Sequence, residues 1–340
     1  MALPWLRNDA MKHLHLLIPD LLLPHDAMQR ISAGLKLPFL SKILARSDQT
    51  NALHRELEDG LCETFGAQAF APIRAAADGL EVGSAYWMCV DPIHLELQQS
   101  QVILQPEVKC GAEESAALCV ALNQHFSQDG ITFIAPHPQR WYIHSDGGAD
   151  VQTTPLRVAS WRDVKPYQPQ GADALRWRSF SNEIQMLLHG HVINQGREAR
   201  GMQAINSVWL WGGGCANDIK TKVGAIGGDE SLSSPFAKVA AIPYCSSLAD
   251  MLRVECEAGV WVESALATAW QRGDLYAWRD AMEWVERELA QPLWMAIEQG
   301  RLQTLTFDVL TETETRRFVF DRAASWKLWR RTSSLPAYVV

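Results

Sequence analysis

HLHLLIPD, residues 13–20, is the stretch of sequence from which the fold can be predicted. His13–Ile18 has the apolar content of a short buried strand, and Pro19 ends it because proline cannot continue a strand ladder. Asp20 follows at once. An acidic residue at the carboxyl end of a first strand stands where open α/β sheets place ligand or metal chemistry. We therefore predict an α/β fold with Asp20 as a candidate catalytic or metal-binding residue.

Apolar patterning on the C-terminal side of this strand predicts alternating strands and helices. We expect helices at Leu175–Leu188 and Leu275–Glu288. A loop at His189–Gly201 should follow the first of them. Further strands are expected at Ser207–Trp211, Phe236–Ile242, Val260–Glu263 and Thr304–Leu310, with Arg317–Phe320 completing a terminal hairpin. This alternation favours a mostly parallel sheet with helices on both faces.

A different pattern occupies residues 81–155. Alternating apolar residues predict a strand pair at Asp91–Leu97 and Gln101–Gln105. Two more strands are expected at Ile131–Ile134 and Trp141–Ile143. Glu113–Phe126, between the two pairs, has helical spacing. The β-β-α-β-β order predicts a smaller inserted α+β domain over 81–155, so that the α/β core comprises 1–80 and 156–340.

Composition limits the classes of partner. The formal net charge is −8 and the pI is near 5.7. No Lys/Arg block stands out, so we expect neither nucleic acid nor membrane as a partner. The N-terminus lacks a secretory signal pattern and no apolar run is long enough to span a bilayer, so we expect a cytoplasmic protein.

Cysteine and tryptophan usage adds two expectations. The seven cysteines are odd in number, scattered, and form no C-x-x-C motif, which indicates reduced buried thiols. Fourteen tryptophans is an unusually high number. Most should form core or pocket wall, and any that are exposed would indicate an aromatic interaction patch.

The densest group of polar signals lies in residues 181–214. Asn182, Gln185 and His189 are spaced to share one helix face. The side chains of the segment that we predict to bind a ligand are Asn182, Gln185, His189, His191, Asn194, Arg197 and Asn206. An arginine fork with neutral amide donors suits a small anionic ligand such as a phosphate. The alternative is structural: the same residue types cap helices and tie down loops.

Known phosphate-binding and hydrolase motifs are not found. The three glycines at 212–214 permit close backbone approach to a ligand or a tight turn after the strand, but they match neither G-x-G-x-x-G nor G-x-x-x-x-G-K-[ST]. The nucleophile motif G-x-S-x-G does not occur either. Nucleotide binding through these motifs and serine-hydrolase chemistry therefore have no support.

Five segments together carry a family resemblance over nearly the whole chain: IPDLLLP (18–24), DPIHL (91–95), LNQHFSQDGITFIAPHPQRWYI (122–143), NEIQMLLHGHVIN (182–194) and INSVWLWGGG (205–214). They resemble a bacterial phosphoglycerate-mutase-like family, also labelled as regulatory proteins of the regulation-of-pathogenicity-factors E type. More distantly, the chain resembles archaeal-type cofactor-independent phosphoglycerate mutases of the alkaline phosphatase superfamily. Those enzymes have a metal-binding α/β domain interrupted by a smaller α+β domain.

The resemblance implies two divalent cations, Mn or Zn, held by Asp and His residues beside a Ser or Thr nucleophile. Asp20 matches the first aspartate of that set, and Ser47 and Thr50 are the nearby nucleophile candidates. No histidine follows His191 in the chain, so the imidazole ligands near the C-terminal strands are missing. Positions that in the mutases help to hold substrate match Arg140, His189, Asn194, Arg197 and Asn206.

Three hypotheses follow from this pattern. The first is a degenerate, metal-free relative of the mutases that binds a small anionic metabolite or a protein partner in a regulatory role. The second is an active metal-dependent phosphotransferase or phosphoglycerate mutase. The third is a structural scaffold that uses an exposed aromatic patch.

Overall fold

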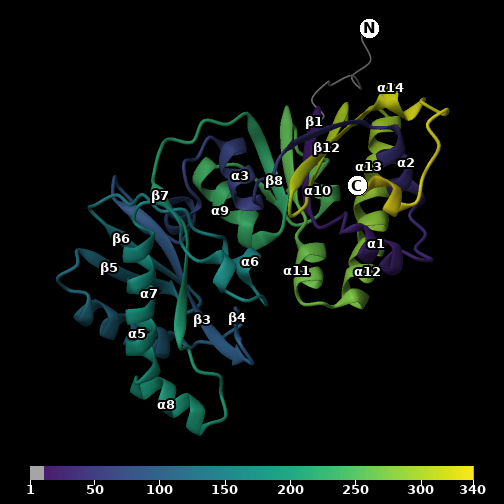
Figure 1. The fold of residues 1–340 in the computed structure, drawn as a ribbon. Helices are drawn as coiled ribbons and strands as arrows, with labels where there is room; N and C mark the ends of the chain where they lie inside the picture. The colour runs from purple at the N-terminus through teal and green to yellow at the C-terminus, as the bar shows by residue number, and fades with distance from the viewer. Residues whose placement is uncertain (1–10, 340) are drawn as a thin grey trace. The chain divides into compact units, whose positions relative to one another are not determined.

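The computed structural model describes residues 11–339, and these divide into two compact units. The first unit contains residues 11–65 and 220–339, and the second contains residues 66–219. Figure 1 shows the elements of both. No helix within residues 11–339 is long and apolar enough to cross a membrane.

A seven-stranded sheet forms the centre of the first unit, in the order β2-β12-β11-β1-β10-β8-β9. Its strands are β1 (His13–Pro19), β2 (Asp48–Leu53), β8 (Val223–Gly228), β9 (Tyr244–Cys245), β10 (Ala258–Val262), β11 (Thr304–Leu310) and β12 (Glu314–Asp321). The pairs among β11, β1, β10, β8 and β9 are parallel, whereas β12 pairs antiparallel with both β11 and β2. The predicted mostly parallel sheet and the terminal hairpin are both confirmed.

Helices cover both faces of this sheet, as predicted (Figure 1). They are α1 (His25–Ile31), α2 (Pro38–Arg46), α3 (Leu57–Phe65), α9 (Glu230–Ala240), α10 (Leu248–Met251), α11 (Ala265–Gln271), α12 (Leu275–Trp284), a π-helical segment (Val285–Ala290), α13 (Gln291–Glu298), α14 (Arg322–Ser325) and a C-terminal 3₁₀ turn (Leu335–Tyr338). On one face α2, α12 and α13 contribute to the main hydrophobic core. On the other, α9 packs against β8, and its Phe236 ring lies 4.8 Å from Phe65 of α3.

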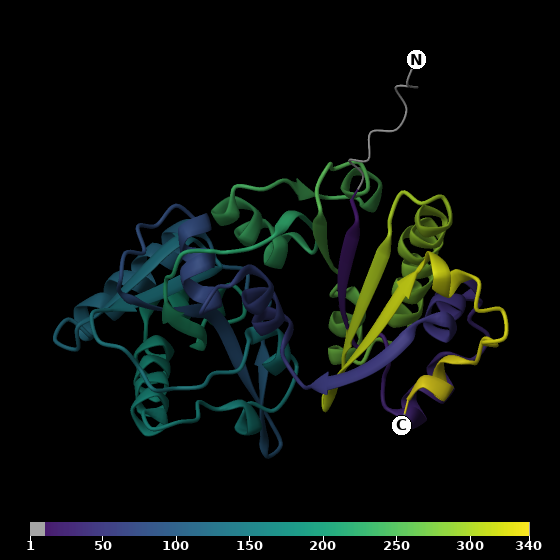
Figure 2. The ribbon, with the colours of Figure 1, turned by 90° about the horizontal axis from the view of Figure 1, so that it is seen from above.

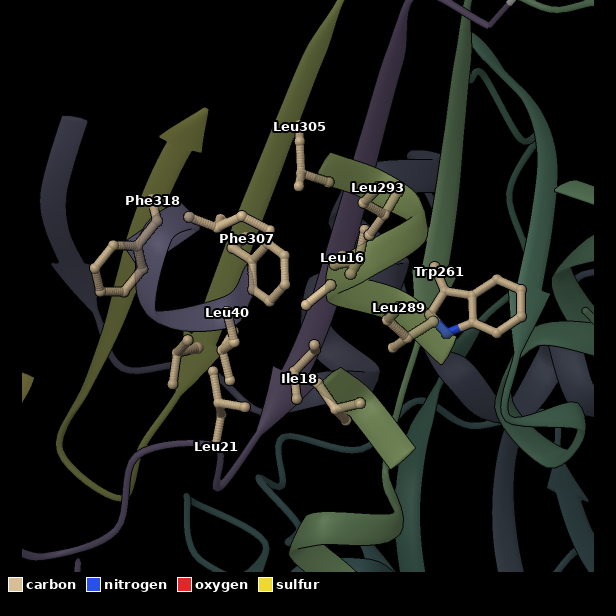
Figure 3. Packing of buried hydrophobic residues seen from close by; sticks show 14 of the residues in the cluster. Leu16, Ile18, Leu21, Leu40, Trp261, Leu289, Leu293, Leu305, Phe307 and Phe318 are labelled. Carbon is tan, nitrogen blue, oxygen red and sulfur yellow. The ribbon is translucent and has the colours of Figure 1, made fainter. Parts of the chain in front are cut away.

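The main core follows from strand alternation. Successive side chains of a strand point to opposite faces, so Leu14, Leu16 and Ile18 of β1 enter the core together with Phe307 and Phe318 of the neighbouring strands. Figure 3 shows Leu16, Ile18, Phe307 and Phe318 among the side chains of this core. The intervening residues of the same strands face the opposite side of the sheet. Figure 2 shows β1, β11 and β12 side by side.

The second unit has a five-stranded sheet in which β3 is central and pairs with β4, β6 and β7. Its strands are β3 (Tyr86–Gln98), β4 (Gln101–Gln105), β5 (Ile131–His137), β6 (Arg140–Ser145) and β7 (Ser207–Cys215). Its helices are α4 (Phe70–Ala77), α5 (Ala112–His125), α6 (Leu156–Ala159), a 3₁₀ turn (Lys165–Tyr167), α7 (Ala174–His189) and α8 (Val192–Ala199). Ring contacts among Phe126, Phe133 and Phe180 join α5 and α7 to the sheet.

This second unit is larger than the predicted 81–155 insertion. It also takes in α4 on the N-terminal side and α7, α8 and β7 on the C-terminal side. The physical reason is strand pairing. β7 pairs antiparallel with β3 instead of joining the parallel sheet, and its Trp209 and Trp211 are buried in the second unit.

Three local predictions are wrong. Phe236–Ile242, expected as a strand, lies largely in α9, whose N-cap Asp229 accepts a hydrogen bond from Ser231 N. The expected loop His189–Gly201 contains α8, capped by the His191 ring. Glycines 212–214 continue β7 instead of forming a turn after it. Short runs of apolar and small residues fit both the two-residue period of a strand and the 3.6-residue period of a helix. Tertiary packing therefore decides between strand and helix.

Candidate functional site

Two of the predicted ligand residues, Asn182 and Gln185, line one hollow of the second unit. They stand about one turn apart on α7, which places both side chains on one helix face. The hollow, which we call the amide hollow, has a volume of about 240 Å³, and Gln168, Ser181 and Ser207 also line it. These neutral groups each donate and accept hydrogen bonds, so the amide hollow suits a polar ligand.

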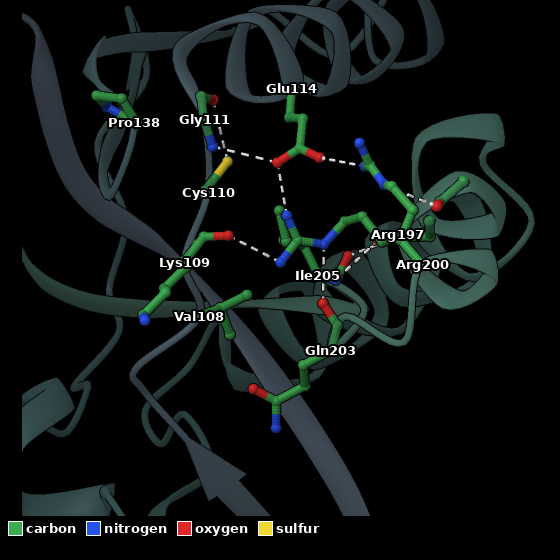
Figure 4. A network of polar contacts seen from close by, with 12 residues as sticks. Val108, Lys109, Cys110, Gly111, Glu114, Pro138, Arg197, Arg200, Gln203 and Ile205 are labelled. Atoms are coloured by element: carbon green, nitrogen blue, oxygen red, sulfur yellow. Dashed lines mark hydrogen bonds and ion pairs between the residues drawn. The ribbon is translucent and has the colours of Figure 1, made fainter.

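Arg197 is placed differently, inside the second unit (Figure 4). Its side chain is 1% exposed. Its Nε donates to the Gln203 carbonyl at 2.8 Å, Nη1 to the Glu114 carboxylate at 2.5 Å, and Nη2 to the Lys109 carbonyl at 2.8 Å. Each guanidinium nitrogen thus has a protein acceptor. In this structure Arg197 fastens α8 to α5 and the strand connection before it, and it offers no exposed surface to a ligand.

Asn194 and Asn206 also bind backbone. The Asn194 Nδ2 donates to the carbonyls of Leu188 at 2.7 Å and Ile205 at 2.8 Å, and its Oδ1 accepts from Ile205 N at 2.8 Å. Asn206 exchanges the same kind of bonds with Leu95 of β3. These contacts match the structural alternative, in which such residues tie down a loop.

The two histidines of the segment lie at helix ends. His191 caps α8, because its Nδ1 accepts a hydrogen bond from Ile193 N at 3.2 Å. His189 is the exposed last residue of α7. Neither lines the amide hollow. The structure therefore brings together only Asn182 and Gln185 of the predicted set around one cavity.

Arg140 belongs to a separate ion pair. Its Nε and Nη2 donate to the Asp78 carboxylate at 2.9 Å each, and the Tyr142 hydroxyl donates to the same carboxylate at 2.6 Å. Burial alone would raise the pKa of Asp78, but the hydrogen bonds from Arg140 and Tyr142 lower it below its ordinary value. The Arg140 side chain is 42% exposed, so a contact with a ligand remains sterically open to it.

A buried ion pair beside it explains part of the tryptophan content. Arg74 of α4 donates to the Asp91 carboxylate of β3 at 2.8 and 2.6 Å. Its guanidinium lies 4.8 Å from the Tyr142 ring centre and 5.0 Å from that of Trp211. The Trp211 indole also donates to Asp91 at 2.9 Å. Because the charges are paired and stacked, this group fixes α4 on the sheet.

The carboxyl ends of β8, β9 and β10 surround a second hollow, in the first unit. This edge hollow has a volume of about 300 Å³ and is lined by Gly228, Asp229, Ser246, Trp261, Glu263, Ser264, Ala265 and Trp284. The Ser264 hydroxyl donates to Asp229, and Ala265 N donates to Glu263 at 3.0 Å. Burial, followed by the nearby Asp229 charge, raises the pKa of Glu263. With Asp229 and Glu263 in its lining, the edge hollow is acidic and unsuited to an anion.

Asp20 lies at the carboxyl end of β1, where the sequence places it, but it does not line the edge hollow. Its backbone has φ of 55°, a left-handed conformation that aspartate tolerates. Its N–H donates to the Leu310 carbonyl at 3.0 Å, and its carbonyl accepts from the Trp278 indole at 3.1 Å. These bonds fix the turn that follows β1.

The donor set at this edge does not fit two divalent cations. Side chains at the ends of the central strands are carboxylates and serines, and none is an imidazole. Asp229 accepts from the Ser231 and Ser264 hydroxyls. Across residues 11–339, no group of three or more His, Cys, Asp or Glu side chains is placed to hold a metal ion. We derive no reaction step through Mn or Zn.

A third polar group, missed as a site from sequence, lies on the sheet face opposite the main core. We call it the Asp308 cluster: His15 of β1, Asp308 of β11 and Arg317 of β12. Arg317 Nε and Nη2 donate to the Asp308 carboxylate at 2.7 and 2.6 Å, and His15 Nε2 lies 2.8 Å from it. The Asp308 side chain is 3% exposed, His15 24% and Arg317 41%.

The electrostatics of the Asp308 cluster define its hydrogen-bonding roles. Burial alone would raise the pKa of Asp308, but hydrogen bonds from Arg317 and His15 outweigh it and lower that pKa to about 2. The carboxylate is therefore ionised at neutral pH and only accepts, so His15 Nε2 is the donor. This leaves His15 Nδ1 and the Nη1 amino group of Arg317 without a bond to Asp308. The sequence signal was present, because these polar residues alternate with core residues on paired strands.

Comparisons with known proteins bear on this arrangement. No family model matches the chain. A probable 2,3-bisphosphoglycerate-independent phosphoglycerate mutase from Geobacter sulfurreducens is 25% identical over 197 residues, which span 56% of this chain and 48% of that protein. A 2,3-bisphosphoglycerate-independent phosphoglycerate mutase from Methanosarcina mazei is 26% identical over 107 residues, 31% of this chain and 27% of that protein. The resemblance to such mutases is thus supported, over about half or less of their length.

Solved structures support the fold. The PH0037 protein from Pyrococcus horikoshii superposes with a TM-score of 0.55 at 12% identity, covering 92% of this chain and 88% of that one. A cofactor-independent phosphoglycerate mutase from Thermoplasma acidophilum gives a TM-score of 0.45 at 11% identity, covering 92% and 90%. With the observed sheet order, the first of these confirms the predicted α/β fold class.

Proposed function

We propose that this phosphoglycerate-mutase-like chain is a binding protein for a small anionic metabolite, in a regulatory role that needs no two-metal centre. The observation that carries the proposal is the Asp308 cluster, in which a buried carboxylate holds a partly exposed arginine and histidine side by side. Arg317 and His15 are both partly exposed, and neither Arg317 Nη1 nor His15 Nδ1 bonds to Asp308.

The ligand class follows from those atoms. The Nη1 group of Arg317 carries two N–H donors, which suit a phosphate or carboxylate oxygen. The Nδ1 atom of His15 accepts a hydrogen bond from a ligand hydroxyl when neutral and donates one to an oxyanion when protonated. A metabolite that carries both a phosphate or carboxylate and a hydroxyl group satisfies both side chains. The names of the relatives, which are phosphoglycerate mutases, point to the same class of ligand.

Thermal unfolding with added ligand tests the proposal. Inorganic phosphate or 3-phosphoglycerate at ten times its Kd should stabilise the native chain by about 1.4 kcal/mol. Arg317→Gln should remove this stabilisation relative to its own ligand-free state, and Arg301→Gln, an exposed arginine elsewhere in the first unit, should retain it. If neither compound stabilises the protein at 10 mM, the proposed ligand class is wrong. If Arg317→Gln responds like the wild type, the proposed site is wrong.

The residues predicted around Asn182 supply a comparison variant. In Asn182→Ala/Gln185→Ala the amide hollow loses two of its polar walls while the Asp308 cluster is unchanged. A stabilisation lost here and kept in Arg317→Gln would place the anion in the second unit. That result would support the ligand class and overturn the site.

An active metal-dependent phosphotransferase is the second candidate, favoured by the printed names of the relatives. Metal analysis of the purified protein tests it. Two equivalents of Mn or Zn, together with mutase turnover that Asp20→Ala abolishes, would establish this candidate and overturn the metal-free proposal.

A further inference from the structure

The segment Trp326–Arg331 exposes three large apolar side chains within four residues. Trp326 is 70% exposed, Leu328 68% and Trp329 76%. Large apolar side chains usually leave water on folding, and single exposed ones are common, but three so close together form a continuous patch. We call Trp326, Leu328 and Trp329 the tryptophan patch. It is independent of the Asp308 cluster and of the proposed function.

The tryptophan patch is presented by a fixed backbone. Arg46 Nη1 donates to the Ser325 carbonyl at 2.5 Å, and Arg330 Nη1 donates to the Ser47 carbonyl at 2.6 Å. Lys327 Nζ lies 2.8 Å from the Asp48 carboxylate, which also pairs with Arg330 at 3.0 Å. Lys327 and Arg330 are thus paired with Asp48, whereas Trp326, Leu328 and Trp329 beside them are mostly exposed to solvent.

Charge determines which partner fits. Residues 322–331 contain Arg322, Lys327, Arg330 and Arg331 and no acidic residue, in a chain whose net charge is −8. Arg322 and Arg331 have no ion-pair partner among residues 11–339. Two copies of this patch would repel each other, so a symmetric dimer through it is disfavoured. An anionic surface is attracted instead.

We propose that the tryptophan patch and its flanking cations dock the protein reversibly on an anionic lipid surface. Tryptophan prefers the boundary between lipid headgroups and acyl chains, where its ring is apolar and its N–H stays hydrated. Arginine and lysine beside it meet the negative headgroups. Trp326 and Leu328 also line a hollow of about 240 Å³ with Glu298 and Arg322, so it is the positive charge of the segment that favours a lipid surface. This revises the expectation of no membrane contact, which rested on finding no Lys/Arg block.

Vesicle flotation with the full chain tests the proposal. The probes are vesicles of phosphatidylcholine alone and of phosphatidylcholine with 30% phosphatidylglycerol. The protein should float with the second kind at low salt, with a blue shift of tryptophan emission. Trp326→Ala/Trp329→Ala should lower partitioning at least tenfold. Arg322→Gln/Arg331→Gln should lower it roughly fivefold per removed cation and only on anionic vesicles.

Matched controls keep the test specific. Leu175→Ala removes an apolar side chain that is 80% exposed elsewhere, and its partitioning should equal that of the wild type. No flotation at millimolar lipid, or flotation that survives Trp326→Ala/Trp329→Ala, would overturn the proposal. So would self-association in sedimentation velocity that the tryptophan variant abolishes, because the patch would then be a protein interface.

Discussion

Replacing Asp308 by asparagine tests the electrostatic account of the cluster. The variant keeps the size of the side chain and removes its charge, so Arg317 and His15 lose an ionised acceptor. A pKa lowered from 3.8 to about 2 in the folded state means that folding favours the carboxylate. At about 1.4 kcal/mol per pKa unit, this contributes roughly 2 kcal/mol to the free energy of unfolding at pH 7.

The sign of the pH dependence follows from that shift. A lowered folded-state pKa gives stability that is present above the unfolded-state value near 4 and is lost as the pH falls toward 2. The difference between wild type and Asp308→Asn should therefore be about 2 kcal/mol at pH 7 and about 1 kcal/mol at pH 3. Urea unfolding followed by tryptophan fluorescence at several pH values measures it.

Asp280→Asn, at an exposed position of the same unit, is the matched control and should change the free energy of unfolding little at any pH. A difference between wild type and Asp308→Asn that stays constant from pH 7 to pH 3 would refute the reasoning. Packing or hydrogen bonding, and not the charge of Asp308, would then hold β1, β11 and β12 together.

Three further substitutions have expected outcomes. Arg74→Ala leaves Asp91 buried without its cation and should lower the free energy of unfolding by about 3–5 kcal/mol in urea titration. Asn194→Ala removes three backbone bonds and should cost about 2–3 kcal/mol while leaving ligand-induced stabilisation unchanged in thermal scans. Gly228→Ala, at φ of 90° and with a Cβ that would overlap the Val262 carbonyl, should give no folded protein by circular dichroism.

The parallel sheet could be predicted because its strands carry two independent signals. His13–Ile18 is short, apolar and ended by Pro19, and Thr304–Leu310 is short with alternating apolar residues; both form strands at nearly the predicted limits. Leu175–Leu188 has enough turns for its period to be unambiguous, and α7 matches it within one residue at each end. The local sequence pattern was sufficient to predict an element where the periodic run was long, as in α7, or where a breaker such as Pro19 ended it.

Pairing between distant segments could not be predicted in the same way. The apolar run Ser207–Trp211 fits a parallel sheet as well as an antiparallel one, and the choice of β3 as partner is a tertiary event. That single pairing shifts the boundary of the second unit from 155 to 219. Glycine-rich β8 had too few apolar residues to be recognised, although it contributes one wall of the edge hollow.

The predicted site residues fall into two groups that differ in what their side chains contact. Asn182 and Gln185 face a cavity, whereas Arg197 and Asn194 satisfy backbone groups inside the fold. Residue type alone cannot distinguish these roles, because a buried donor needs a partner whether the partner is a ligand or a carbonyl. The Asp308 cluster was missed for the opposite reason. His15 and Asp308 are 293 residues apart along the chain and meet only through strand register.

The proposed loss of a two-metal centre and the proposed retention of anion binding are physically compatible. Phosphoryl transfer needs cations to neutralise charge that develops in the transition state. Recognition of an anion in its ground state needs only fixed donors, and an arginine held on two points by a buried carboxylate is such a donor. The proposed anion binding therefore requires no metal ion, provided that Asp308 stays ionised and Arg317 stays partly exposed.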